Sequence, residues 1–542
     1  MSRRTIVAIG LGLIGLALAW HNRFIQDDAF ISFQYARQLA EGQGLTWFGT
    51  RVEGYSNFAW VLWIAAGIKA GIDPIVWAHV GSLTCFIALI FAFWRLSGRV
   101  FDTLWPRAVA GLLLVTNFTV SAYATGGLET MLQTALLCVA TWQLYELRAG
   151  APHTAVRLVG VSVALAVAVL AHPDSALPAA IIGTWSLVEL RRRRAGYGAC
   201  LAGLGPFVLL IGAWVAWKVA YYGDVLPNTY YAKVGFGWPA LANGGLYLVR
   251  FATAYLIWPF LLGGAFACFV RRCPVRRDMG PILFLLASWC AYVIAVGGDF
   301  MEFRFLVPVT PHLFLLLVYL IEKPCRTVAP IAPPAVLAAS CVVLTAASYW
   351  HATHFTDITP DRTLDSIPQL STFYTLCPDG DWGRLGRALR RDLGDADVTI
   401  ACTGVGAIPY YSRLKTVDLL GLNDSDVARH GWRAHPDYRR PGHQVFATLQ
   451  QLRDKRVHLV VGYPPLVPPG ELKRAGARQW AAQFVRQIVH PDDKWSGRAT
   501  VVAMPLDERH AHLMWYLTPH PRIDQLIASG RWDSLSVFVT PP

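Results

Sequence analysis

The stretch Asp27-Asp28-Ala29-Phe30-Ile31-Ser32-Phe33-Gln34-Tyr35-Ala36-Arg37 follows the first apolar segment of the chain, residues 5–20. It begins with two adjacent carboxylates and continues as a short amphipathic run. Carboxylates beside lipid are costly and tend to mark function. In so hydrophobic a chain, this pair predicts chemistry at the boundary between water and lipid.

The composition predicts a membrane protein with many spans. Of the 542 residues, 54% are hydrophobic and 15% are charged, whereas a soluble protein carries about 25% charged residues. The charge deficit falls almost wholly before residue 350, where apolar runs of spanning length recur. The net charge of +13 does not indicate nucleic-acid binding, because most Lys and Arg cluster in short loops between apolar runs.

About eleven segments are long and apolar enough to be predicted as spans. If Arg3 and Arg4 are cytoplasmic, alternate loops should be basic, and they are. The basic loops contain Arg95, Arg99 and Arg107, then Arg148 and Arg157, then Arg191 to Arg194, then Arg271, Arg272, Arg276 and Arg277, and last Lys323 and Arg326. The predicted spans lie near residues 5–20, 75–95, 107–123, 128–147, 157–172, 176–190, 200–221, 246–270, 280–297, 305–321 and 329–349.

Residues 57–72 are the ambiguous apolar stretch. They are short for the roughly 20 residues of a span and contain Lys69. Counting them as a span would reverse every later loop and place Arg191 to Arg194 outside. We therefore expect an interfacial helix here, within a long first outer loop of residues 21–74.

The first apolar segment admits two interpretations. Arg3 and Arg4 before it and Ala17-Leu18-Ala19 at its end are compatible with a cleavable signal peptide. An uncleaved first helix is the preferred interpretation, and both place Asp27 and Asp28 outside the cytoplasm.

Unusual polar clusters occur in the loops opposite the basic ones. Five widely separated segments are involved, and scattering by chance would have put some of them on the basic face. We expect them to converge at one outer site. They are Asp27-Asp28 with Glu53, residues 126–130 with Glu129, His172-Pro173-Asp174, residues 223–233, and residues 297–304 with Asp299 and Arg304.

Residues 350–542 have a globular composition. Short β-rich runs at 398–401, 456–461, 500–504 and 536–540 alternate with helical stretches such as 382–393. This alternation favours a small α/β domain, which eleven spans would place outside the cytoplasm. Residues 1–349 then form the membrane domain. Cys377 and Cys402 are the cysteines of this region, and the sequence leaves open whether they form a disulfide.

Two short patterns in this region resemble known motifs but are discounted. Gly404-Val405-Gly406 lacks the third glycine of a dinucleotide fingerprint, because Pro409 stands there, so a tight turn is the better interpretation. Asp424-Ser425-Asp426 matches a D-x-D pattern, which is too short to be specific. A solvated turn is expected there.

Taken in order, the polar segments resemble the C-type glycosyltransferase superfamily, integral membrane enzymes that use polyprenyl-phosphate sugars. More narrowly, they resemble the terminal β-(1→2)-arabinofuranosyltransferase group. The resemblance covers residues 27 to about 424. The matching pieces are Asp27-Asp28-Ala29-Phe30-Ile31-Ser32 with Tyr35-Ala36-Arg37, Val52-Glu53-Gly54-Tyr55 with Asn57-Phe58, Gly127-Leu128-Glu129-Thr130, Tyr222-Gly223-Asp224 with residues 226–233, residues 297–301 with Arg304-Phe305, and residues 419–424.

The resemblance implies a mainly α membrane helix bundle with an α/β extracytoplasmic domain, in a bacterial inner membrane with the site facing the periplasm. It implies transfer of a sugar, D-arabinofuranose above others, from a polyprenyl-phosphate donor to a glycan, lipid or protein acceptor. Related transferases that move a hexose or aminoarabinose are the alternative. A lipid-linked sugar transporter is the alternative from another class, although transporters place polar sites near the midplane and often show repeats.

The reaction implied by the resemblance needs a base beside the acceptor and cations on the departing phosphate. Asp27, Asp28 and Glu53 are the catalytic candidates, and similar enzymes carry an essential acid at the position of Asp27. The bland alternatives are helix capping for Asp28 and a surface ion pair of Glu53 with Arg51. The substrate-binding candidates are Arg51, Tyr55, Glu129, His172, Asp174, Asn228, Tyr231, Lys233, Asp299 and Arg304.

Several of these candidates also have structural explanations. Lys233 and Arg304 either hold a phosphate or extend to the interface, and Asp299 either pairs with Arg304 or joins the site. Relatives carry Arg where this chain has His172, so a fixed cation becomes a titratable one. Converging carboxylates are compatible with a divalent cation, yet no ligand spacing requires one.

Overall fold

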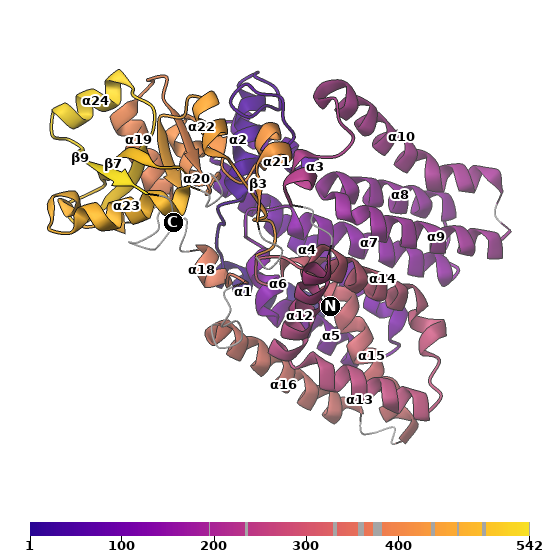
Figure 1. Cartoon of the computed structure of the whole chain (residues 1–542). Helices are drawn as coiled ribbons and strands as arrows, with labels where there is room; N and C mark the ends of the chain where they lie inside the picture. Colours follow the sequence, from indigo (N-terminus) through magenta and orange to yellow (C-terminus); the bar gives the residue numbers. More distant parts are fainter. Residues whose placement is uncertain are drawn as a thin grey trace.

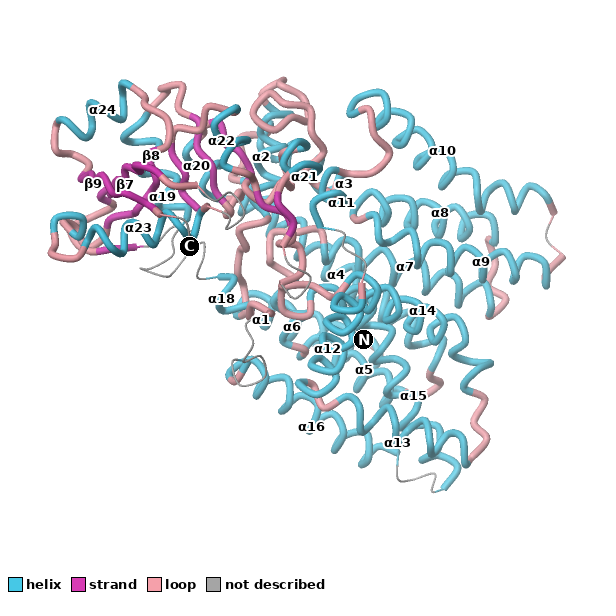
Figure 2. Tube along the Cα trace, in the orientation of Figure 1, coloured by secondary structure: helices cyan, strands magenta, loops and turns pink. Residues whose placement is uncertain are grey.

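The computed structural model describes residues 1–194, 196–233, 237–328, 333–355, 363–371, 382–434, 440–462, 466–489 and 495–540. A large helical part precedes a smaller domain that contains the strands (Figure 1). Figure 2 shows the strands, in magenta, gathered at one side of the molecule, while the first part is helix and loop. The predicted fold class, a helical membrane bundle with an α/β domain after it, is confirmed.

The helical part is built from long apolar helices joined by short loops. Its elements are α1 (Arg3–His21), α2 (Ala29–Ala40), α3 (Phe58–Lys69), α4 (Pro74–Val100), α5 (Leu104–Thr116), α6 (Phe118–Tyr123), α7 (Thr130–Arg148), α8 (Thr154–Ala171), η1 (Pro173–Ser175), α9 (Ala176–Arg192), α10 (Tyr197–Tyr222), α11 (Asn228–Lys233), α12 (Trp238–Ala254), α13 (Ile257–Val270), α14 (Val275–Val296), η2 (Arg304–Val309), α15 (Thr310–Val328) and α16 (Pro333–Thr353).

Within the described residues, seven helices are long and apolar enough to cross a membrane, namely α1, α4, α8, α10, α14, η2 with α15, and α16. The pair α12 and α13, bent by 87°, would make an eighth. Each of the predicted spans coincides with a helix or a helix pair, but three of them fall short of these criteria. α5 ends early because the Asn117 side chain accepts from Val120 N and starts α6. α9 has 17 residues, and α7 lies inside the bundle with polar side chains such as Gln133 and Glu146 buried.

The stretch predicted as an interfacial helix forms α3, which has 12 residues. At about 1.5 Å per residue it is about 18 Å long, well short of the roughly 30 Å hydrocarbon core. It packs against α2 and α4, so the long first loop is a folded unit rather than a loose connection.

The C-terminal domain has a mixed sheet. Among the described residues, the strand order is β2-β1-β5-β8-β7-β9, with β6 paired to β8; β1 pairs with β2 and β5 in parallel and the other pairs are antiparallel. The elements are α18 (Ile367–Ser371), α19 (Trp382–Leu393), β1 (Thr399–Cys402), α20 (Ala407–Ser412), β2 (Lys415–Asp418), α21 (Ser425–His430), β3 (Trp432–Arg433), β4 (Val445–Phe446), α22 (Leu449–Asp454), β5 (Leu459–Gly462), β6 (Leu466–Val467), η4 (Glu471–Lys473), α23 (Ala477–Ile488), β7 (Gly497–Pro505), β8 (Ala511–Tyr516), α24 (Pro521–Ala528) and β9 (Asp533–Val539).

The predicted strands and the predicted helix of this domain are confirmed in β1, β5, β7, β9 and α19. The first discounted pattern lies in a turn, because Gly404 to Gly406 join β1 to α20. The solvated turn expected at Asp424-Ser425-Asp426 is wrong: Ser425 and Asp426 begin α21, and the Asp424 carboxylate caps that helix by accepting from Asp426 N and Val427 N. Cys402 is a buried free thiol, and Cys377 lies outside the described residues.

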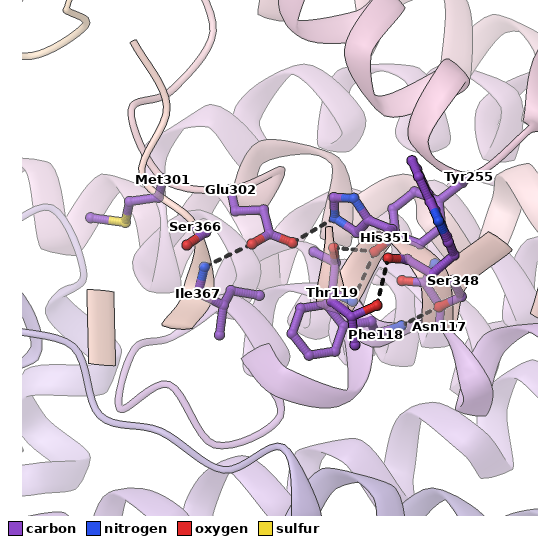
Figure 3. A network of polar contacts seen from close by, with 12 residues as sticks. Asn117, Phe118, Thr119, Tyr255, Met301, Glu302, Ser348, His351, Ser366 and Ile367 are labelled. Atoms are coloured by element: carbon purple, nitrogen blue, oxygen red, sulfur yellow. Dashed lines mark hydrogen bonds and ion pairs between the residues drawn. The ribbon is translucent and has the colours of Figure 1, made fainter. Parts of the chain in front are cut away.

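A buried polar network ties the outer loop of residues 297–305 to the rest of the molecule. One Glu302 carboxylate oxygen lies 2.7 Å from His351 Nε2, near the end of α16, and the other accepts from Ile367 N at 2.7 Å (Figure 3). Glu302 and His351 are fully buried. Losing one partner of a buried pair leaves the other unsatisfied and is costly, so this network fixes the loop that carries Asp299 and Arg304.

Candidate active site

A cavity of about 350 Å³ lies where the loops that carry the polar segments of the helical part meet the C-terminal domain. All five polar segments singled out in the sequence contribute to its wall, so the predicted convergence is confirmed. The C-terminal domain adds Leu422, Pro441 and Gly442. The polar segments supply Asp28, Tyr55, Glu129, His172, Asp174, Lys233, Asp299 and Arg304.

Asp28 is the N-cap residue, immediately before the helix α2, and it lines the cavity. Its side chain makes no capping hydrogen bond, so the structural explanation for this residue does not apply. Burial raises the pKa of the Asp28 carboxyl, while the positive charges of Lys233 and Arg304 oppose that rise. A carboxylate in this state is suited to accept a proton.

Asp27 points away from the cavity and into the C-terminal domain. Its two carboxylate oxygens accept from Ala407 N at 2.7 Å and from Gly406 N at 3.0 Å. A Cβ atom at Gly406 would lie 1.9 Å from the Asp27 carbonyl oxygen, so this close approach requires glycine. Burial raises the pKa of Asp27 to about 7, against the hydrogen bond from Ala407.

Two cationic side chains face Asp28. Arg304 donates from Nε to Asp299 Oδ2 at 2.7 Å, which orients its guanidinium at the cavity wall. Lys233, the last residue of α11, lines the same cavity, and no ion pair joins it to another residue in the described part of the chain. Lys233 is therefore available to an anionic ligand.

His172, Asp174 and Glu129 form the wall beside α7 and α8. His172 Nδ1 lies 2.7 Å from Asp174 Oδ1, and Gln133 Nε2 also donates to Asp174. Burial lowers the pKa of His172, but Asp174 outweighs it, so the pKa is raised and the protonated form is favoured. A protonated His172 supplies the positive charge that the Arg of the resembled family would carry at this position.

Glu129 stands at the entrance to α7 but makes no capping hydrogen bond. Its carboxylate instead accepts from Asn57 Nδ2 at 2.7 Å, and Asn57 also exchanges hydrogen bonds with Ser32. Both Asn57 and Ser32 line the cavity. They were not predicted as site residues, although both belong to segments that carried the resemblance.

Glu53 and Arg51 do not line the cavity. Glu53 Oε2 lies 2.8 Å from Lys218 Nζ of α10, and both side chains are buried. Burial raises the pKa of Glu53 to about 7, although Lys218 opposes the rise. Arg51 lies over the ring of Tyr221, 4.9 Å from its centre. The alternative of an Arg51–Glu53 ion pair is therefore wrong, because Glu53 pairs with Lys218.

Asn228 and Tyr231 join the outer loop to α21 rather than facing the cavity. Asn228 Nδ2 donates to the carbonyl oxygens of Gly421 at 2.7 Å and Leu422 at 2.9 Å. The Tyr231 hydroxyl donates to Asp224, which also accepts from Arg429 of α21. These contacts hold Leu422 in place over the cavity.

The contribution of Pro441 and Gly442 was missed in the sequence. No motif distinguishes this Pro-Gly pair from an ordinary turn, and it approaches the site only through the fold: a Cβ atom on Gly442 would lie 3.7 Å from the Lys233 side chain. Tyr292 and Phe300 were also missed; they add aromatic wall near Arg304. In the part of the chain that the structure describes, no group of three or more His, Cys, Asp or Glu side chains is placed to hold a metal ion.

Comparison with known proteins finds one curated relative and several solved structures that resemble this chain. The terminal β-(1→2)-arabinofuranosyltransferase of Corynebacterium glutamicum is 26% identical over 347 residues, which are 56% of this chain. The chain spans about half the length of that curated relative, 48%. A domain of unknown function (DUF8728) matches residues 374–509.

The fold resembles that of a solved structure. The crystal structure of ArnT from Cupriavidus metallidurans bound to undecaprenyl phosphate superposes with a TM-score of 0.55 over 94% of this chain and 97% of that one, at 12% identity. The apo structure of the same protein gives 0.56. The helical part and the C-terminal domain thus follow the overall arrangement of ArnT, and the chain shares its fold.

Proposed function

We propose that this protein transfers a sugar from a polyprenyl-phosphate donor to a glycan or glycoconjugate acceptor. The observation that carries the proposal is the placement of one carboxylate, Asp28, opposite two cations, Lys233 and Arg304, in one cavity. A lipid-phosphate sugar has an anionic phosphate next to its anomeric carbon. Lys233 and Arg304 suit the phosphate, and Asp28 suits the hydroxyl that attacks the anomeric carbon.

In the proposed reaction, the acceptor hydroxyl oxygen attacks the anomeric carbon while its proton passes to the Asp28 carboxylate. The bond between the anomeric carbon and the phosphate oxygen breaks, and polyprenyl phosphate leaves with the bonding electrons. Lys233 and Arg304 hold the negative charge that develops on that phosphate. Asp299 keeps the Arg304 guanidinium oriented.

The remaining candidates act around this centre. Glu129 and Asp174 line the cavity and are assigned to the sugar or the acceptor, as is Tyr55, whereas the protonated His172 is assigned to the donor phosphate. Asp27 is proposed as a positioning residue, because its carboxylate fixes the turn before α20 next to Asp28. Four other candidates are proposed to support the residues that line the cavity without lining it themselves: Glu53, Arg51, Asn228 and Tyr231.

The sugar proposed is D-arabinofuranose, because the curated relative carries that specificity in its name. A hexose or aminoarabinose donor is the alternative, and the shared fold with ArnT is compatible with it. The cavity and the C-terminal domain are proposed to face the periplasmic side of a bacterial inner membrane, because the loops at the other ends of the helices are the basic ones. The acceptor then approaches from water, beneath Leu422 and Pro441.

The test is reconstitution of the purified protein in liposomes with radiolabelled polyprenyl-phosphate sugars and a glycan acceptor. Labelled product is expected with the arabinofuranosyl donor and should be lost with Asp28→Asn. Asp395→Asn is the matched control, because that carboxylate is 87% exposed in the C-terminal domain. If product forms only with another donor, the sugar of that donor replaces D-arabinofuranose in the proposal. Movement of donor across the membrane without covalent product would instead indicate a transporter.

A further inference from the structure

A second cavity lies within the membrane part, far from the candidate active site. It has a volume of about 560 Å³, within the range of about 300–1,000 Å³ of ligand pockets. Its wall is formed by α13, α15 and α16. The lining includes Gly263, Gly264 and Ala267, together with Leu320, Ile321 and Val336.

This groove is apolar with a cation at one end. Arg271 is the only charged side chain among the described residues that line it, and the hydroxyl of Ser340 is already bonded to Val336 O. Arg271 is exposed, and no ion pair joins it to another described residue. The groove therefore suits a ligand with a long apolar part and an anionic group.

The surroundings of Arg271 strengthen the positive charge. Six basic residues lie at the α13–α14 corner and the end of α15, against two acidic ones, Asp278 and Glu322. Glu322 is paired with Arg326, and Asp278 accepts from Tyr319. The basic residues are Arg271, Arg272, Arg276, Arg277, Lys323 and Arg326.

The helix α14 indicates the depth in the membrane at which the Arg271 end of the groove lies. It starts at Val275, four residues after Arg271, and its last residue, Val296, lines the candidate active site. Its 22 residues give about 33 Å at about 1.5 Å per residue, close to the roughly 30 Å of a hydrocarbon core. Arg271 thus lies at the headgroup level of the opposite face.

The groove is also open to the surrounding lipid. Neighbouring side chains of α13 point outward, with Phe266 69% and Phe269 81% exposed. A Cβ atom on Gly263 would meet nothing within 4 Å, whereas one on Gly264 would lie 2.8 Å from Leu320. Gly264 lets α13 approach α15 closely, and Gly263 leaves the groove empty beside that contact.

We propose that this groove binds one phospholipid with an anionic headgroup, its acyl chain between α13 and α16 and its phosphate at Arg271. Basic pockets between spans on the cytoplasmic side bind such headgroups. This site does not depend on the proposed transferase activity, since it uses none of the same residues.

Native mass spectrometry of the full-length protein tests the site. The protein is offered equal amounts of phosphatidylglycerol and phosphatidylcholine with identical chains. One retained phosphatidylglycerol is expected, preferred by about fivefold, which converts to about 1 kcal/mol. Equal retention of both lipids by the wild type would contradict the proposal.

Two variants separate charge from groove. Arg271→Gln should keep a bound lipid but lose the preference, and Gly263→Leu should lower retention of both lipids at least about fivefold, because the side chain fills the groove. Arg191→Gln and Gly212→Leu are matched controls: an exposed arginine at the end of α9, and an exposed glycine of α10 with nothing within 4 Å of its Cβ position. Unchanged retention in Gly263→Leu, or one-for-one displacement of the phospholipid by polyprenyl phosphate, would overturn the assignment.

Discussion

Asp27 and Asp28 are neighbours in the chain but belong to two different regions. Asp28 lies in the cavity, where Lys233 and Arg304 face it across open space. Asp27 lies in the seam, which we define as the contact of the outer loops with the C-terminal domain through Asp27, Asn228 and Tyr231. In the seam each of these side chains has a hydrogen-bond partner within the protein.

The presence or absence of protein partners separates residues that stabilise the fold from residues that are available to bind a ligand. Buried polar groups with complete partners stabilise a contact, while a charged group without a protein partner beside a cavity marks a site. Substitutions in the cavity should therefore reduce activity and leave stability nearly unchanged. Substitutions in the seam should lower stability first, and activity should fall only as far as the position of Asp28 is disturbed.

The largest expected effect is on the cavity side. Asp28→Asn removes the proposed proton acceptor, and general base catalysis contributes about 10²–10⁴-fold. We expect the turnover number in the reconstituted assay to fall at least about 100-fold, with the melting temperature within about 2 °C of wild type. A drop in melting temperature as large as that of a seam variant would remove the distinction between the two regions.

Lys233→Gln should have the next largest effect. Removing one charge-assisted contact to a phosphate costs about 1.5–3 kcal/mol, so KM for the donor should rise at least about tenfold while kcat changes less. The measurement is donor saturation at fixed acceptor. Lys473→Gln, at a lysine that is 74% exposed, is the control and should leave KM unchanged; an unchanged KM in Lys233→Gln would remove this residue from the donor site.

Asp27→Ala tests the seam. It leaves the Gly406 and Ala407 amides without their acceptor, at a cost of about 1–3 kcal/mol for an unsatisfied buried group. Thermal unfolding should shift downward, and Asp27→Asn, which keeps one acceptor oxygen, should recover part of the loss. If instead Asp27→Asn abolishes turnover at full stability, Asp27 is the catalytic carboxylate and the assignment of the pair is reversed.

The sequence predicts the cavity better than it predicts roles within it. The long apolar stretches predict the helices, and the basic loops between them predict which loops share a side. The loops opposite the basic ones meet in one cavity, as expected. Which way a side chain turns at the start of α2 depends on the Gly406 turn, about 380 positions later, and no local pattern carries that information. The same holds for Glu53, which pairs with Lys218. In the sequence, Lys218 is an isolated charge in an apolar helix, and nothing near it shows that Glu53 neutralises that charge.

The smallest expected effect concerns His172, whose pKa is raised because Asp174 outweighs burial. The protonated form faces Glu129 and Arg304 as well as Asp174. Because the folded-state pKa lies above the unfolded value of 6.5, the stabilisation by the His172–Asp174 pair is complete below that value and is lost as pH rises through the folded pKa. Binding of polyprenyl phosphate should weaken a few-fold over the same range, because the imidazole loses the positive charge that attracts the phosphate.

His172→Arg fixes the positive charge and should remove this pH dependence while the site keeps its affinity at low pH. The measurement is the Kd of polyprenyl phosphate between about pH 6 and 9, a range set by the direction of the His172 shift. His430→Arg, at an exposed histidine of α21, should keep the wild-type profile. A profile that persists in His172→Arg would assign the titration to Asp28, whose pKa is also raised, and would place His172 with the supporting wall rather than with the ligand.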